Sequence, residues 1–175
     1  MTDVGMIELI TGGTRSGKSS HALHVAESLA GNRHFIATAE AHDGEMAKRI
    51  AQHQKERSAA WQLTEEARCL SGQVPRFTGG DIVLVDCLTL WVTNWLCARD
   101  PDGWSEEKRR FLEALATSPA HWLLVSNETG LGVIPVDPLS RRFVDESGRL
   151  HQDLAAMANR VTLVTMGIPR VIRER

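Results

Sequence analysis

The stretch that most constrains this chain is a glycine-rich segment near its N-terminus, which reads GGTRSGKS from residue 12 to residue 19. It fits the phosphate-binding pattern G-x-x-x-x-G-K-[ST] without a substitution. A run of strand-forming residues, 6–11, precedes it, and apolar residues at helical spacing follow it over 20–29. A strand, a tight loop and a helix in this order are the context that the pattern requires, which favours a binding loop over a chance match in a glycine-rich turn.

Each part of this segment has a chemical reason to bind a nucleoside triphosphate. Glycines let backbone N–H groups turn toward phosphate oxygens at the N-terminal end of a helix. Lys18 adds a mobile positive charge and is the first candidate for a catalytic residue, while Ser19 offers a hydroxyl to Mg²⁺. The predicted nucleotide-binding residues of the loop are Gly12, Gly13, Thr14, Arg15, Ser16, Gly17, Lys18 and Ser19.

Composition argues against several other classes of protein. The 175 residues carry 20 basic and 22 acidic side chains, a net charge of −2. No positive excess suggests binding to nucleic acid or to an anionic membrane, and no segment approaches the roughly 18 apolar residues of a membrane span. The three cysteines lack C-x-x-C spacing, which speaks against a disulfide framework or a zinc site. We expect one domain over residues 1–175 in a cytoplasmic protein with a small polar substrate.

Alternating strand and helix patterns predict the fold. The expected strands are residues 6–11, 34–38, 81–86, 122–126 and 161–166. The expected helices are 20–29, 45–57, 88–98, 105–116 and 138–160, the last interrupted near Gly148, and residues 58–80 show only a short helix around 67–70. This order predicts an α/β fold of the P-loop NTPase type, with three layers in which a mostly parallel central sheet has helices on both faces.

The strand at 81–86 carries a second element of the expected site. It is continuously apolar after Asp81 and ends on Asp86. A carboxylate at this position typically lies beside the phosphate loop and helps a hydroxyl such as that of Ser19 to hold Mg²⁺. The alternative is that Asp86 only caps the following helix.

The helix expected at 88–98 has an apolar surface wider than one core-facing stripe. Trp91 and Trp95 both belong to this surface. We expect part of it to contact another copy of the chain, which would make the protein a homo-oligomer. The alternative is a helix that is buried widely in the core of its own chain.

Several segments together resemble one enzyme family nearly end to end. They are the loop at 12–19, IATA at 36–39, EM at 45–46 with RI at 49–50 and His53, DCLTLWVTN at 86–94, and NE at 127–128 with Gly130, Gly132 and Pro135. With them the chain resembles the bifunctional adenosylcobinamide kinase/adenosylcobinamide-phosphate guanylyltransferase family of cobalamin biosynthesis. The resemblance implies phosphorylation of adenosylcobinamide with ATP or GTP. It also implies transfer of GMP from GTP to that phosphate through a guanylylated histidine, giving adenosylcobinamide-GDP and pyrophosphate.

The resemblance also implies roles for residues outside the loop. His53 is the expected nucleophile, because a neutral imidazole can attack the α-phosphorus of GTP and release pyrophosphate. Some family members have two adjacent histidines where this chain has Gln52 and His53, and His42 is the alternative. The other implied nucleotide contacts are Ala37, Thr38, Ala39, Gln54, Lys55, Glu56, Glu65 and Asp86. The implied partners are GTP or ATP, Mg²⁺, a corrinoid substrate and further copies of the chain in a homo-oligomer, for which the family suggests a trimer.

The sequence leaves two other functions open. One is a P-loop kinase of another small alcohol or of a nucleotide, without nucleotidyl transfer. The other is a non-catalytic module whose loop senses GTP or ATP. The segments around Asp86 and at Asn127-Glu128 favour an enzyme, because they match an enzyme family. No motif identifies the group that deprotonates the substrate hydroxyl.

Overall fold

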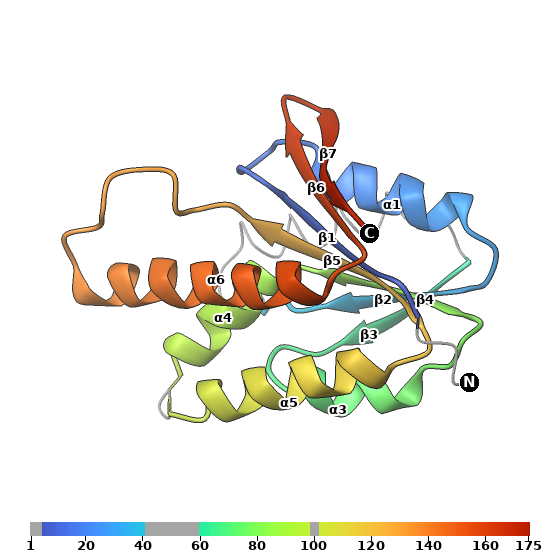
Figure 1. Ribbon diagram of the computed structural model, residues 1–175. Coiled ribbons are helices and arrows are strands. Elements are labelled where there is room, and N and C mark those ends of the chain that lie inside the picture. The colour runs from blue at the N-terminus through green and yellow to red at the C-terminus, as the bar shows by residue number, and fades with distance from the viewer. Residues whose placement is uncertain (1–4, 41–59, 99–101) are drawn as a thin grey trace.

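The described residues contribute seven strands to one sheet, in the spatial order β3-β2-β4-β5-β1-β6-β7. The computed structural model describes residues 5–40, 60–98 and 102–175 (Figure 1). The strands are β1 Ile7–Gly12, β2 Asn32–Ala37, β3 Trp61–Glu65, β4 Asp81–Asp86, β5 His121–Asn127, β6 Arg160–Thr165 and β7 Ile168–Glu174. β1 to β6 are parallel, and β7 is antiparallel to β6. The loops that follow the parallel strands therefore gather at one edge of the sheet, where ligands of such folds bind.

Helices cover both faces of this sheet. They are α1 Lys18–Ser28, α3 Leu70–Gln73, the 3-10 helix η1 Val74–Arg76, α4 Leu88–Leu96, α5 Trp104–Thr117 and α6 Pro138–Met157. Figure 1 shows α1 on one face and α3, α4, α5 and α6 on the other. Among the helices that the structure describes, none has the length and apolar character needed to cross a membrane. The predicted three-layer α/β architecture with a mostly parallel sheet is confirmed.

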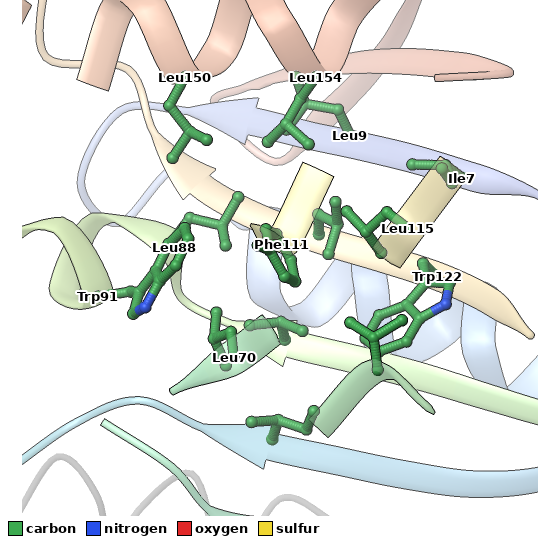
Figure 2. Packing of buried hydrophobic residues seen from close by; sticks show 14 of the residues in the cluster. Ile7, Leu9, Leu70, Leu88, Trp91, Phe111, Leu115, Trp122, Leu150 and Leu154 are labelled. Carbon is green, nitrogen blue, oxygen red and sulfur yellow. The ribbon is translucent and has the colours of Figure 1, made fainter. Parts of the chain in front are cut away.

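Two apolar cores lie on the two faces of the sheet. Alternation along β1 turns Ile7 and Leu9 toward α6 and the larger core, part of which Figure 2 shows. The same alternation turns Ile10 toward α1, where it packs in one cluster with Ala22 and Ala26. Because both faces of the central strands are covered, β4 and β5 can be apolar at consecutive positions, which is the pattern that made them recognisable in the sequence.

The wide apolar surface of α4 is used inside the chain. Trp91 is fully buried, and its ring contacts those of Trp104 and Phe111 edge-on, with centroids 4.8 and 5.0 Å apart. The indole N–H groups of Trp91 and Trp95 both donate to the carbonyl of Arg68, at 2.7 and 2.9 Å. Trp91 is therefore part of the core of its own chain. This agrees with the alternative stated above, a helix buried widely in its own core, rather than with contact of Trp91 with another copy.

Two strands lie where the sequence predicts none. β3 and β7 are the outermost strands of the sheet, and most of their side chains are partly or fully exposed. An edge strand needs no continuous apolar run and tolerates a proline such as Pro169, because only one side of it pairs. The expected end of the last strand near Gly167 is instead the turn of a hairpin between β6 and β7.

The last helix differs from its prediction in being continuous. α6 runs through Gly148 without a break, capped by the side chain of Asp137, which accepts the backbone N–H of Ser140 at 2.9 Å. A glycine inside a helix costs about 1 kcal/mol relative to alanine. Burial of Leu150 and Leu154 against the sheet offsets that cost, so tertiary packing overrides local propensity here. The helix expected at 45–57 lies outside the described residues.

Candidate active site

The phosphate loop joins β1 to α1 at the C-terminal edge of the sheet. β1 ends at Gly12 and α1 begins at Lys18, with left-handed backbone at Arg15 (φ 57°) and Gly17 (φ 93°) between them. Position 12 requires glycine, since a Cβ there would lie 2.4 Å from the carbonyl oxygen of Val164. The predicted strand, loop and helix are in place, and the backbone turns as a phosphate-binding loop does.

Two neighbouring segments hold this loop by backbone hydrogen bonds. The N–H of Glu128 donates to the carbonyl of Gly12 at 2.9 Å, and the N–H of Gly167 donates to the carbonyl of Ser16 at 2.8 Å. The buried hydroxyl oxygen of Ser16 has no hydrogen-bond partner among the described residues. An unpartnered hydroxyl in such a loop fits a ligand that brings its own acceptor oxygens, as a phosphate does.

Lys18 is the buried positive charge of the site. Its Nζ donates to the carbonyl of Gly13 at 3.1 Å. Burial lowers the pKa of Lys18, and the negative charge of Asp86 opposes that change. Lys18 and Asp86 thus interact electrostatically although β5 separates β1 from β4. The charge of Asp86 therefore reaches the loop lysine across β5, which is compatible with the predicted place of this carboxylate beside the phosphate loop.

Ser19 and Asp86 fit the metal that a triphosphate brings. A hydroxyl and a carboxylate are hard oxygen donors, the kind that Mg²⁺ prefers. The described part of the chain has no cluster of three or more histidine, cysteine or acidic side chains suited to hold a metal by itself. This donor set suits Mg²⁺ held partly by phosphate oxygens and water, as is usual for nucleotide sites, rather than an all-protein cage.

Strand register brings three of the predicted nucleotide contacts into one row. Ala37 pairs with Glu65 on one side and with Asp86 on the other, at the C-terminal ends of β2, β3 and β4. Ala39 follows β2 and is partly buried. These residues share the edge of the sheet that also carries the phosphate loop, with Glu65 on the outermost strand, β3.

Thr38 is fully buried and connects the ends of β2 and β4. Its hydroxyl donates to the carbonyl of Cys87 at 2.7 Å and accepts the N–H of the same residue at 2.9 Å. The amide of Asn94 on α4 donates to the carbonyls of Thr38 and Ala67, at 2.8 and 2.9 Å. Burial, assisted by the charge of Asp86, raises the pKa of the Cys87 thiol to about 12, so this cysteine stays protonated. What Thr38 does in this structure is to fix the segment that carries Asp86.

A polar cluster that the sequence does not single out lies beside the loop. It consists of Thr89 on α4, Ser126 on β5, Glu128 after β5 and His151 on α6. His151 Nε2 lies 2.7 Å from Ser126 Oγ, and His151 Nδ1 lies 4.0 Å from Glu128 Oε2. Thr89 and Glu128 belong to segments that carry the family resemblance, but nothing in the sequence links them to His151.

The remaining predicted site residues lie outside the part of the chain that the structure describes. They are the expected nucleophile His53 with its neighbours Gln54, Lys55 and Glu56, and the alternative nucleophile His42. Their roles stay predictions. The three cysteines, by contrast, are all described and are free.

The fold and the loop define a P-loop NTPase-type α/β protein. Similarity to the solved structure of the RadB recombinase supports this fold alone, with a TM-score of 0.57 at 13% identity over 99% of this chain and 83% of that one. At the level of family, the model of the cobinamide kinase / cobinamide phosphate guanyltransferase family matches residues 8–172, and the chain belongs to this family.

Two curated relatives agree with this assignment. A bifunctional adenosylcobalamin biosynthesis protein, CobP, of Pseudomonas aeruginosa is 46% identical over 169 residues, which cover 96% of this chain and 98% of the relative. A protein of the same description from Escherichia coli, CobU, is 38% identical over 93% of this chain and 97% of its own. The family predicted from the sequence and its enzyme class are therefore confirmed.

Proposed function

We propose that this chain phosphorylates adenosylcobinamide with ATP or GTP and then transfers GMP from GTP to the new phosphate. The observation that carries the proposal is the family match over 8–172, together with a complete phosphate loop that contains the buried Lys18. Both reactions use a nucleoside triphosphate, so one phosphate loop can serve both. The products of the second are adenosylcobinamide-GDP and pyrophosphate.

In the kinase step, the loop holds the triphosphate while the substrate hydroxyl attacks the γ-phosphorus. Lys18 leaves the carbonyl of Gly13 and contacts phosphate oxygens, where its charge offsets the charge that develops on the leaving nucleotide. Ser19 and Asp86 would hold Mg²⁺, which when bound neutralises and orients the phosphates. Thr38 keeps the segment of Asp86 in position through its bonds to Cys87.

In the guanylyl step, we assign the nucleophile to His53. A nitrogen of its neutral imidazole attacks the α-phosphorus of GTP, a P–N bond forms, and the bond to pyrophosphate breaks. An oxygen of adenosylcobinamide phosphate then attacks the same phosphorus and releases the histidine. Support for this assignment comes from the family resemblance, which also assigns guanine-nucleotide contacts to 37–39, 53–56 and Glu65. The position of Glu65 in the row of strand ends is compatible with that role.

The guanylyl step is tested by incubation with α-labelled GTP. The wild-type protein should retain an acid-labile, base-stable label, because a phosphoramidate has these properties. His53→Ala should lose the label, while His24→Ala, which removes an exposed histidine from α1, should keep it. Absence of label on the wild type would contradict guanylyl transfer. Retention by His53→Ala, with loss in His42→Ala, would move the nucleophile to His42.

The kinase step is tested with γ-labelled GTP and γ-labelled ATP in the presence of adenosylcobinamide. Labelled adenosylcobinamide phosphate is the expected product, and comparison of the two nucleotides gives the preferred donor. Phosphorylation of other alcohols but not of adenosylcobinamide would favour a kinase of a different substrate. Nucleotide binding without any phosphorylated product would favour a sensing module.

We also propose that the protein is a homo-oligomer, and a trimer by its family resemblance. The loop after β5 exposes several large apolar side chains, a property of surfaces that contact other proteins. They are Leu131, Val133, Ile134 and Val136, exposed to 88, 97, 77 and 94%. Sedimentation equilibrium should give three times the mass of the chain, and Val133→Glu with Val136→Glu should lower it. A monomeric mass for the wild type at micromolar concentration would contradict the proposal.

A further inference from the structure

Glu128 is placed beside the phosphate loop by the strand arrangement. It directly follows β5, which pairs with β1 so that Asn127 lies opposite Gly12. Its backbone N–H donates to the carbonyl of Gly12 at 2.9 Å, which fixes the start of the loop after β5 against the start of the phosphate loop. Adjacent strands are about 4.8 Å apart, so the backbone of Glu128 lies next to the segment expected to hold the triphosphate.

The carboxylate of Glu128 is held on one oxygen and available on the other. Oε1 accepts the backbone N–H of Gly130 at 2.7 Å. Oε2 makes no hydrogen bond that the described residues supply, and His151 Nδ1 lies 4.0 Å from it. The side chain is 29% exposed, so a substrate group can reach it. A fixed carboxylate with one free oxygen at the edge of a phosphate site has the geometry of a proton acceptor.

A chain of hydroxyl groups sets the orientation of His151. The backbone N–H of Asn127 donates to Thr89 Oγ1 at 2.7 Å, which leaves the Thr89 hydroxyl proton free to point at Ser126 Oγ, 3.4 Å away. Ser126 in turn has its own proton to donate to His151 Nε2 at 2.7 Å. With Nε2 as acceptor, a neutral imidazole carries its proton on Nδ1, the nitrogen that faces Glu128.

Burial of the His151 ring supports this neutral form. The side chain is only 13% exposed. Burial lowers the pKa of His151, and the charge of Glu128 opposes the change. His151 therefore presents a neutral N–H toward the free oxygen of Glu128. The two atoms are 4.0 Å apart, so a small approach of either side chain is needed for a hydrogen bond that orients the carboxylate without consuming its negative charge.

We propose that Glu128 is the group that accepts the proton of the substrate hydroxyl in the kinase step, and that His151 is its positioning residue. The inference rests on the proposed function. As the hydroxyl oxygen forms its bond to the γ-phosphorus, the bond from that phosphorus to the bridging β,γ-oxygen breaks, and its electron pair leaves with the nucleoside diphosphate. The hydroxyl proton passes to Glu128 Oε2, and the carboxylic acid later returns it to water.

The other described carboxylates whose contacts are known at this edge are less suited to the role. Asp86 is the expected metal ligand, and its charge opposes the lowering of the Lys18 pKa. Glu66 accepts hydrogen bonds on both oxygens, from the backbone of Arg68 and Cys69 and from the side chain of Gln73. Glu65 lies on β3, which β2, β4 and β5 separate from β1. Among these four residues, only Glu128 has a backbone hydrogen bond to the phosphate loop, from its N–H to the carbonyl of Gly12.

The test compares Glu128→Gln with the wild type in both reactions. In the kinase reaction, Glu128→Gln should lower kcat by about 100-fold or more, the usual effect of a lost general base, while KM for GTP changes less than about threefold. Formation of the labelled enzyme from α-labelled GTP should be unchanged, because that step abstracts no hydroxyl proton. Glu113→Gln, at an exposed ion pair on α5, is the matched control and should leave both reactions unchanged.

The role of His151 is tested by a pair of substitutions. His151→Leu keeps the bulk but removes the N–H, and should lower kcat of the kinase reaction about tenfold with KM unchanged. His151→Asn places an amide N–H near the position of Nδ1 and should recover most of that loss. A purely structural role would instead make the smaller, polar asparagine the worse replacement in a buried site.

Three outcomes would overturn the inference. A kcat for Glu128→Gln within threefold of wild type would exclude the carboxylate as proton acceptor. Loss of enzyme labelling in Glu128→Gln together with loss of kinase activity would show that Glu128 supports the loop and not deprotonation. Equal losses in His151→Leu and His151→Asn would exclude positioning through an N–H. Failure of the proposed function is distinguished beforehand, since wild-type enzyme would then form no adenosylcobinamide phosphate.

Discussion

The backbone N–H of Gly167 donates to the carbonyl of Ser16 at 2.8 Å, so the hairpin turn between β6 and β7 is bonded to the phosphate loop. The two segments also approach closely at Gly17, where a Cβ would lie 3.1 Å from the Cα of Gly167. Both glycines have positive φ, 93° and 77°, which residues with a side chain adopt only at a cost. The sheet edge opposite to β3 thus supports the loop from outside, leaving its inner side for phosphate.

The same crowding makes a prediction about Gly12. A Cβ at this position would lie 2.4 Å from the carbonyl of Val164 and 2.5 Å from Ser16 Oγ, whereas a Cβ at Gly13 would meet nothing within 4 Å. Gly12→Ala should therefore lower the free energy of unfolding by about 1–3 kcal/mol, and Gly13→Ala by less than about 0.5 kcal/mol. Urea denaturation without nucleotide measures both. Equal destabilisation by the two substitutions would contradict the steric difference between positions 12 and 13.

Removal of the loop lysine should lower enzymatic activity without lowering the stability of the fold. Because burial disfavours the charged form of Lys18, Lys18→Met should leave the free energy of unfolding unchanged or higher. Without the charge, phosphorylation of adenosylcobinamide and labelling by α-labelled GTP should both fall by about 100-fold or more. Lys108→Met, which removes a lysine paired with Asp153 outside the site, should keep both activities. Full labelling by Lys18→Met would restrict the lysine to the kinase step.

Local sequence signals explain which parts of this protein could be predicted. The signals for the loop at 12–19 and for the strand at 81–86 lie in consecutive residues. The phosphate-binding motif, the strand and the chemistry expected of both could therefore be predicted from the sequence. β3 and β7 were not, because an edge strand is half exposed and lacks an apolar run. α6 was predicted with a break because local propensity at Gly148 is poor, and the packing that overrides it comes from the distant sheet.

The site shows the same division between local and distant information. Asp86 could be predicted to lie beside the phosphate loop because the rules of parallel sheets place strand ends together. No such rule places His151 next to Ser126, since their contact depends on how far along β5 the helix α6 crosses. Thr38 was expected only as a lining residue, while the structure shows its hydroxyl bonded twice to Cys87, a contact that requires knowing that β2 neighbours β4.

This double contact predicts a stability role for Thr38. Thr38→Val keeps the shape but leaves the buried N–H of Cys87 without its partner, and the carbonyl of Cys87 keeps only the N–H of Trp91. The free energy of unfolding should fall by about 1.5–4 kcal/mol, for one unsatisfied buried N–H and one further lost hydrogen bond. Thr38→Ser retains the hydroxyl and should lose only about 1 kcal/mol, for one buried methyl group. Chemical denaturation checks both, and a Thr38→Val protein as stable as Thr38→Ser would contradict the role.

At the opposite end of β4, Asp81 predicts a dependence of stability on pH. Burial alone would raise the pKa of Asp81, but hydrogen bonds from the backbone and hydroxyl of Thr78, from Asn32 and from His34 lower it to about 2. An unfolded aspartate titrates near 3.9, so the ionised form is favoured by folding. The resulting stabilisation, roughly 2 kcal/mol, is complete above about pH 5 and is lost as the pH falls toward 2.

Asp81→Asn isolates this contribution from that of every other carboxylate. The amide cannot ionise, so the difference in free energy of unfolding between wild type and Asp81→Asn should shrink by roughly 2 kcal/mol between pH 7 and pH 2. Urea denaturation at intervals across this range measures the difference directly. A gap that stays constant with pH would mean that Asp81 titrates alike in the folded and unfolded chain. Its bonds to Thr78 and Asn32 would then hold the start of β4 without favouring the ionised carboxylate.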